Sequence, residues 1–345
     1  MPNTTWRIIV KVGTSLTHGS IKEIATQSIT AEKNGYDFIT TNEAQHNPFF
    51  PIITASEHTT KIQLVTSIAL AFSRSPMDTA YMAWDLQKMT NGRFILGLGA
   101  QVKGHITRRF SMPYSKPAKR MREYILALKT IWNAWQNQEK LDFQGEFYSF
   151  DLMPPFFTPE PIENPNIKIY LAAVNPMMLQ LAGELCDGVL IHPFNTQKYT
   201  DEVIIPNIQL GAEKSDRSEN SVEINEGGFI VTGPNDHDIE NSKIQTRSQL
   251  AFYASTPSYS PIMNLHGWEN TAKKLYQMSK TGDWNNMGNE IDDEMLNSFA
   301  VIGNYEEIAA RIKSRFSHYA SSIKFSIPEN DDDSILRTII HSIKS

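Results

Sequence analysis

The chain has 345 residues, 40% of them hydrophobic, and carries 32 Lys and Arg against 38 Asp and Glu, a formal net charge of −6. Without a clustered basic run, this balance argues against a nucleic-acid-binding surface. The absence of a membrane-length apolar stretch and of a secretory signal pattern at the start predicts a cytoplasmic protein that does not act on membranes. A single cysteine, Cys186, excludes an internal disulfide and a multi-cysteine metal site, and is expected to be a buried small hydrophobe.

Short β-rich runs alternate with helical patterns through the first half of the chain. A capping box at Ser20 and Glu23 predicts the start of a helix that Gly35 ends. A serine followed by Pro76 predicts the start of another helix. The β-rich runs predict strands over 7–12, 36–41, 62–72 and 93–98.

The alternation breaks once and then resumes. A hairpin-like piece and a proline-rich stretch indicate an insertion around 141–166. Further strands are predicted over 167–172, 187–191, 223–232 and 322–327. Eight strands alternating with helices predict an α/β fold, a (β/α)8 TIM barrel forming a single domain over 1–345, with a doubly wound sheet as the alternative.

Polar side chains follow the predicted strands at the ends where such barrels bind ligands. Glu43 and His46 share the loop after the strand over 36–41, and Arg74 follows the run over 62–72. A carboxylate and an imidazole on one loop suit proton transfer. Taken alone, such a pair is more often a hydrogen-bonded loop anchor.

Two other strand ends could receive a ligand. Asn175 and Pro176 begin a helix directly after a strand, where free N–H groups and the helix dipole favour a phosphate. The alternative is an ordinary Asn cap followed by proline, which many helices have, and spacing alone favours that cap. Gly97 and Gly99 begin a dinucleotide-like pattern that lacks its third glycine, so we expect them to let a ligand approach the backbone.

Basic residues follow the strand over 93–98. His105, Arg108 and Arg109 could bind an acidic cofactor tail, and a solvated basic loop is an equal alternative. The nine histidines show no metal-ligand spacing, so no metal site is predicted.

Taken in order, the motifs of the chain resemble those of the bacterial-luciferase-like superfamily of flavin and deazaflavin enzymes, and more narrowly its coenzyme F-420-dependent branch. Each motif is weak alone, and the specificity lies in their joint order and spacing. The motifs include Gly35-Tyr-Asp37, Glu43-x-x-His46-x-Pro48-Phe49, Thr66-Ser-Ile-Ala-x-Ala-Phe-x-Arg-Ser-Pro76, Asn91-Gly-Arg-Phe-x-Leu-Gly-Leu-Gly99, Gln101-Val-Lys-Gly-His105 and Ala172-Ala-Val-Asn-Pro-Met177.

The resemblance implies a barrel with insertions that holds a tricyclic ring, and a non-proline cis peptide between Ser67 and Ile68 that supports the ring. It also implies that the loop of Glu43 and His46 supplies the proton-transfer residue. The cofactor phosphate is expected at the amides that begin the helix after the fifth strand, which belong to Val174, Asn175, Met177 and Met178.

One departure from the family pattern concerns the fourth strand. Several relatives place a glutamate shortly after the glycines there, whereas this chain has Ala100 and Gln101. The proton chemistry of those relatives therefore does not transfer to this position. Gln101 or His105 is expected to contact the cofactor instead, and Gly99 is expected to lie against it at the end of the strand.

The resemblance implies an oxidoreductase that transfers a hydride between F-420 and a small organic substrate, with His46 or Glu43 handling a proton. One alternative is an FMN-dependent monooxygenase that uses oxygen and a partner flavin reductase. Another is a flavin-binding barrel without turnover, which the missing glutamate favours. Relatives are commonly dimers, so a homodimer is expected. The residues do not specify the substrate.

Overall fold

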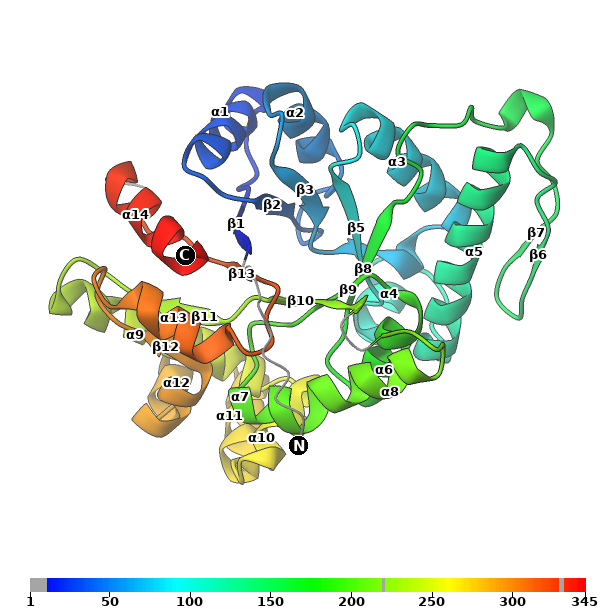
Figure 1. Cartoon of the computed structure of the whole chain (residues 1–345). Coiled ribbons are helices and arrows are strands. Elements are labelled where there is room, and N and C mark those ends of the chain that lie inside the picture. Colours follow the sequence, from blue (N-terminus) through cyan, green and yellow to red (C-terminus); the bar gives the residue numbers. More distant parts are fainter. Residues whose placement is uncertain (1–10, 219–220, 329–331) are drawn as a thin grey trace. The chain divides into compact units, whose positions relative to one another are not determined.

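The computed structural model describes residues 11–218, 221–328 and 332–345, which form two compact units (Figure 1). The first unit comprises Gly13–Leu190 and Asn207–Glu223. The second unit comprises Ile191–Pro206 and Ile224–Ser345, with the described residues that precede Gly13. Each unit is considered separately below.

Six parallel strands form the sheet of the first unit, with the hydrogen-bonded order β1-β2-β3-β5-β8-β9. A short strand, β4, also pairs with β5. Because the strands are parallel, their carboxyl ends lie at the same edge of the sheet. The strands are β1 (Lys11–Ser15), β2 (Phe38–Thr41), β3 (Gln63–Thr66), β4 (Ala69–Leu70), β5 (Phe94–Gly99), β8 (Lys168–Ala172) and β9 (Gly188–Leu190).

Amphipathic helices connect and cover these strands (Figure 1). The predicted capping box begins the first helix, where the Ser20 side chain accepts the Glu23 N–H. The longest helix, α5, fully buries Tyr124 and Trp135. The helices are α1 (Ile21–Lys33), α2 (Phe50–His58), η1 (Ala71–Ser73), α3 (Pro76–Met89), α4 (Lys103–Arg108), α5 (Pro117–Asn137), α6 (Pro176–Leu185) and most of α8 (Ile205–Glu213). The part of α8 that belongs to the first unit begins at Asn207.

The predicted insertion between α5 and β8 contains an antiparallel hairpin. Its strands are β6 (Phe143–Gln144) and β7 (Ser149–Phe150), and a 3-10 turn, η2 (Pro155–Phe157), follows them. Cys186, just after α6, is buried as predicted, and burial raises the pKa of its thiol to about 12.

The second unit contains the last parallel pair of barrel strands, β10 (Glu223–Glu226) and β13 (Ser322–Lys324), in which Glu226 is opposite Ile323. A separate parallel pair joins β11 (Phe229–Val231) to β12 (Ala300–Ile302). The helices are α7 (Gln197–Tyr199), η3 (Thr200–Ile204), α9 (Asp236–Ala254), η5 (Pro257–Tyr259), α10 (Ser260–Leu265), α11 (Glu269–Thr281), η6 (Trp284–Glu290), α12 (Asp293–Phe299), α13 (Ile308–Phe316) and α14 (Asp333–Lys344).

Eight parallel strands alternating with helices, β1, β2, β3, β5, β8, β9, β10 and β13, confirm the (β/α)8 barrel over the doubly wound sheet. Several predicted strands were wrong in extent. The run over 62–72 is interrupted after Thr66, and the run over 223–232 is two strands separated by Gly227 and Gly228. The run over 322–327 ends as a strand at Lys324. The first strand continues to Ser15, and its predicted residues 7–10 lie outside the described part of the chain.

Side chains fix the loop that leads into β3, at the amino ends of the strands. The Glu32 carboxylate accepts the three backbone N–H groups of residues 60–62, with N–O distances of 2.7 to 2.9 Å to one of its oxygens. The Arg93 guanidinium donates to the carbonyl oxygens of Thr59 and Ile62, each at 2.9 Å. These hydrogen bonds fix the entry into β3 at this end of the first unit.

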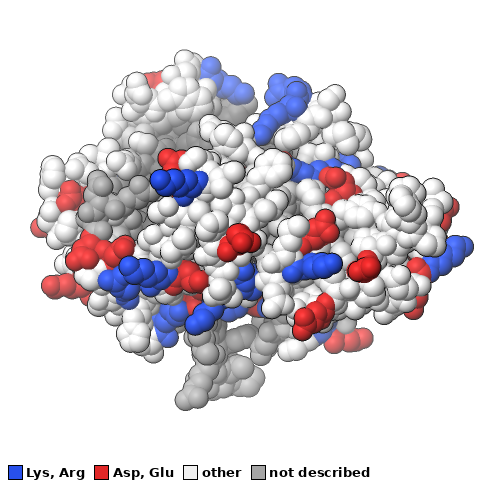
Figure 2. Space-filling model, turned by 90° about the horizontal axis from the view of Figure 1, so that it is seen from above, with Lys and Arg blue, Asp and Glu red and all other residues white. Residues whose placement is uncertain are grey.

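Acidic and basic side chains are interspersed over the face that Figure 2 shows. Of the helices in the described ranges, none combines the length and the apolar character that a membrane crossing requires.

Candidate active site

The peptide bond between Ser67 and Ile68 is cis, as the family resemblance implied. It lies between β3 and β4 and forms a bulge at the carboxyl end of β3. The Ser67 N–H donates to the Thr41 carbonyl oxygen at 2.6 Å, and the Glu43 N–H donates to the Ile68 carbonyl oxygen at 3.2 Å. Backbone hydrogen bonds thus join the bulge to the loop that follows β2.

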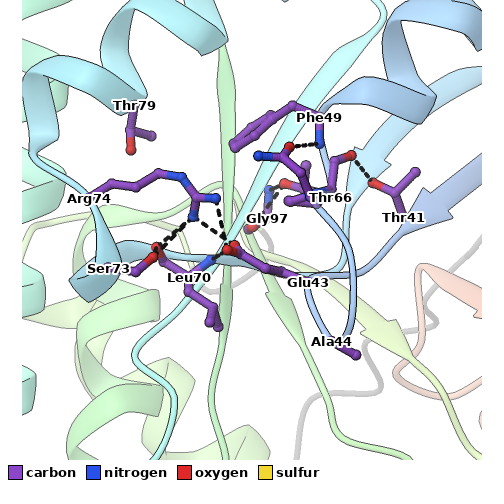
Figure 3. Close-up of polar contacts among 12 residues, drawn as sticks. Thr41, Glu43, Ala44, Phe49, Thr66, Leu70, Ser73, Arg74, Thr79 and Gly97 are labelled. Atoms are coloured by element: carbon purple, nitrogen blue, oxygen red, sulfur yellow. Dashed lines mark hydrogen bonds and ion pairs between the residues drawn. The ribbon is translucent and has the colours of Figure 1, made fainter. Parts of the chain in front are cut away.

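The carboxylate of Glu43 is held from two sides (Figure 3). Its oxygens accept two hydrogen bonds from the Arg74 guanidinium, at 2.7 and 2.8 Å, and one from the Leu70 N–H at 2.8 Å. The exposed fractions are only 13% for the Arg74 side chain and 7% for the Glu43 side chain. With both oxygens engaged, Glu43 has the contacts of a loop anchor.

His46 lies on the same loop and is exposed. Its imidazole makes no hydrogen bond to the part of the chain that the structure describes, and its ring centroid lies 4.4 Å from that of His18. His18 follows β1, so the two imidazoles come from the loops after adjacent strands. Sequence reasoning missed His18 because the first predicted strand ended three residues too early.

The two glycines of β5 accommodate the bulge. A Cβ atom on Gly97 would lie 1.7 Å from the Thr66 carbonyl oxygen, and one on Gly99 would lie 2.0 Å from Cδ1 of Ile68. The Thr66 hydroxyl also exchanges two hydrogen bonds of 2.9 Å with the Gly97 backbone. The space over Gly99 is therefore filled by the Ile68 side chain, and a cofactor contact at Gly99 stays a prediction.

The predicted basic residues lie together after β5. His105, Arg108 and Arg109 line a pocket of about 360 Å³ with Val102 and Gly104. The Arg109 guanidinium also donates to the Ala44 carbonyl oxygen, which connects this segment to the loop of His46 (Figure 3 shows Ala44 on that loop). Gln101, just before the pocket, has a positive φ of 57°.

The amino end of α6 has backbone groups suited to an anion. The N–H groups of Asn175 and Met177 have no acceptor in the described ranges, and the Met177 side chain is 71% exposed. The Met178 N–H donates to the Asn175 carbonyl oxygen at 3.0 Å, so this predicted donor is already used. Unpaired amides at the start of a helix fit a phosphate group.

A barrel with a cis bulge after its third strand and a helix that starts with unpaired amides has the features of the flavin and deazaflavin oxidoreductases that the motifs resemble. The chain belongs to the luciferase-like monooxygenase family, whose model matches residues 5–321. An uncharacterized protein of Mycobacterium tuberculosis is 44% identical over 291 residues, which are 84% of this chain and 86% of the relative.

Another relative is the 5,10-methylenetetrahydromethanopterin reductase of Archaeoglobus fulgidus, 27% identical over 82% of each chain. The solved coenzyme F420-dependent tetrahydromethanopterin reductase from Methanopyrus kandleri superposes with a TM-score of 0.79 at 20% identity, over 97% of this chain and 98% of that one. An F420-dependent secondary alcohol dehydrogenase in complex with an F420-acetone adduct superposes with a TM-score of 0.75 at 16% identity, over 97% of this chain and 99% of that one.

A structure with the other candidate cofactor is also similar. The oxygenating constituent of 3,6-diketocamphane monooxygenase from Pseudomonas putida, solved with FMN, has a TM-score of 0.66 at 13% identity, over 97% of this chain and 96% of that one. These structural similarities establish the barrel fold. The family relationship makes the chain an oxidoreductase-type enzyme with a flavin or deazaflavin cofactor.

Proposed function

We propose that this protein transfers a hydride between coenzyme F-420 and a small organic substrate. The observation that carries the proposal is the cis bulge at Ser67 and Ile68, joined to the loop of His46 in a chain whose relatives include F420-dependent enzymes. Two of the similar solved structures are F420-dependent enzymes, which favours the deazaflavin over FMN.

Three groups of residues in the first unit would hold the cofactor. The bulge would support its ring, and the amides of Asn175 and Met177 would bind its phosphate. The pocket around His105, with its two arginines, would receive an acidic tail, and Gln101 lies beside that pocket. When bound, the deazaflavin supplies the carbon that gives or takes the hydride.

His46 would hold or release the proton that accompanies the hydride, because its imidazole is exposed and makes no hydrogen bond to the described residues. Glu43 would fix the loop on which His46 lies, since the ion pair with Arg74 occupies its carboxylate. We therefore assign the proton to His46 and the positioning to Glu43.

Parallel titrations with F-420 and FMN test the cofactor. We expect F-420 to bind in the micromolar range or tighter, and FMN to bind far more weakly. Hydride transfer is then followed by the absorbance of F-420 across a panel of alcohols, aldehydes and enones. Micromolar binding of FMN with none of F-420 would contradict the proposal.

The FMN-dependent monooxygenase is the second candidate, favoured by the similarity to the 3,6-diketocamphane enzyme. It predicts oxygen consumption when the protein receives reduced FMN from a flavin reductase. Binding of F-420 without transfer to any member of the panel would instead favour the third candidate, a barrel without turnover.

A further inference from the structure

A cluster of polar side chains in the second unit has no part in the proposed chemistry. Glu226 ends β10, Lys324 ends β13, and His192 lies two residues beyond the end of β9. In barrels of this kind the carboxyl ends of the strands carry the ligand-binding groups. The rings of Tyr253 and Tyr259, from α9 and η5, each lie 4.7 Å from the His192 ring.

The carboxylate of Glu226 already has its partners. The Tyr319 hydroxyl donates to Oε2 at 2.9 Å, and the Gly227 N–H donates to Oε1 at 3.1 Å. The Asn195 amide adds a longer contact of 3.4 Å to Oε2. Glu226 is only 3% exposed, and burial raises the pKa of its carboxyl to about 7.

Lys324 has no such partner. Its ammonium makes neither an ion pair within 4.0 Å nor a hydrogen bond to any residue that the structure describes, Glu226 included. The side chain of Lys324 lies close to Gly227 and Pro193. A Cβ atom built on Gly227 would be 3.5 Å from Cε of Lys324 and 3.3 Å from Cγ of Pro193. Burial lowers the pKa of Lys324. Lys324 is half-buried, and an ammonium partly removed from water without an acceptor is unfavourable, so the group is available to an anionic ligand.

His192 adds a second unused donor. Its Nδ1 accepts the Phe194 N–H at 3.0 Å, which leaves the ring proton on Nε2. Burial and the charge of Lys324 lower the pKa of His192 to about 4, so the imidazole is neutral at physiological pH. Neither this Nε2–H nor the hydroxyls of Tyr253 and Tyr259 meet an acceptor within the described ranges.

We propose that Lys324, His192, Tyr253 and Tyr259, here called the donor cluster, bind the carboxylate of an aromatic or otherwise planar organic acid. An ammonium and three further donors without acceptors suit a group that carries charge and accepts several hydrogen bonds. The aromatic rings around His192 suit a planar body beside that carboxylate. The identification of this acid as the substrate rests on the proposed function, whereas its binding does not.

Calorimetric titration of the full-length protein with benzoate and with benzamide tests the site. The two probes have the same shape, and only benzoate is charged. We expect benzoate to bind at least about tenfold more tightly, since a hydrogen bond to a charged group exceeds a neutral one by that order. Lys324→Met should abolish this preference by weakening benzoate alone, Lys324→Arg should keep most of it, and the exposed-charge control Lys88→Met should change nothing.

His192→Phe and Tyr259→Phe keep the test valid if Lys324→Met does not fold, because each removes one donor and should weaken benzoate severalfold. Equal affinities of the wild type for the two probes, or unchanged benzoate affinity in folded Lys324→Met, would overturn the site. Neither probe requires turnover. A protein that shows this benzoate pattern without F-420 binding would retain the site and lose the proposed function.

Discussion

The charged side chains singled out in the two units are partnered in opposite ways. In the first unit the Arg74 guanidinium and the Glu43 carboxylate satisfy each other through two short hydrogen bonds. In the second unit the Lys324 ammonium has no partner among the described residues, although the Glu226 carboxylate lies at the end of the paired strand β10. Charges that are paired inside the protein fix a loop, whereas donors left without acceptors are available to a ligand.

The largest expected effect concerns the pair in the first unit. Arg74→Met leaves the buried Glu43 carboxylate without its opposite charge and with only the Leu70 N–H as a donor, which should lower the free energy of unfolding by about 3 to 5 kcal/mol. Urea denaturation measures the loss. The double substitution Glu43→Gln with Arg74→Met should recover much of it. The more exposed pair of Arg122 and Glu184 serves as a control, and Arg122→Met should cost about 1 kcal/mol or less.

In the second unit, the buried carboxyl of Glu226 should make the free energy of unfolding depend on pH. The folded pKa of about 7 exceeds the ordinary value of 4.5, so the native state keeps a proton that the unfolded chain releases. The free energy of unfolding should therefore fall as pH rises from about 4.5 to 7, by up to about 3 kcal/mol. In Glu226→Gln this fall should be absent.

His192 changes the free energy of unfolding with pH in the opposite direction. Its pKa of about 4 means that the native state releases a proton that the unfolded chain still holds. This contribution is present in both proteins and cancels in their difference. Parallel pH-dependent denaturation curves for the wild type and Glu226→Gln would argue against the raised pKa of Glu226.

Substitution of His46 tests whether its imidazole, which makes no hydrogen bond to the described residues, acts on a ligand. His46→Ala should lower turnover by about 100-fold or more, the usual scale for a general acid or base, and leave the dissociation constant of F-420 nearly unchanged. Stopped-flow absorbance and a binding titration give the two quantities. The control is His58→Ala, at an exposed histidine on α2. Wild-type turnover in His46→Ala would remove His46 from the reaction.

The smallest expected effect concerns the helix start. Met177→Asp places a negative charge in the first turn of α6, which should favour the helix slightly and repel a phosphate. We expect the F-420 affinity to drop about tenfold at unchanged or raised thermal stability. The neutral variant Met177→Gln should bind F-420 like the wild type. Equal affinities of both variants would place the phosphate elsewhere.

Alternating patterns and motif order were sufficient to predict the barrel and most of its strands. The cis bond at Ser67 was available only through the family resemblance, since Ser and Ile occur in ordinary strands. Within the site, the order of Glu43 and His46 along one loop was visible in the sequence. The sequence did not show that Glu43 is paired and His46 is not. The partners of Glu43, the Leu70 N–H and Arg74, are brought to it only by the path of the chain through β4.

Neither the donor cluster nor the neighbouring Glu226 was predicted, and the reason lies in the strand ends that carry Lys324 and Glu226. Glu226 and Lys324 were placed inside longer strands over 223–232 and 322–327, which concealed that each is a terminal residue. The two consecutive glycines, Gly227 and Gly228, were the signal in the sequence that could have identified Glu226 as the last residue of a strand. No comparable signal marks the end of β13.

The clasp made by Glu32 and Arg93 at the amino ends of the strands has a practical consequence for engineering. It secures the entry into β3 without using any group from the opposite edge, where the ligand is proposed to bind. Randomised libraries confined to the segments after β2 and β5 would thus vary recognition while the closure at the opposite end stays intact. Such a division makes the first unit a suitable starting point for directed evolution of new specificities.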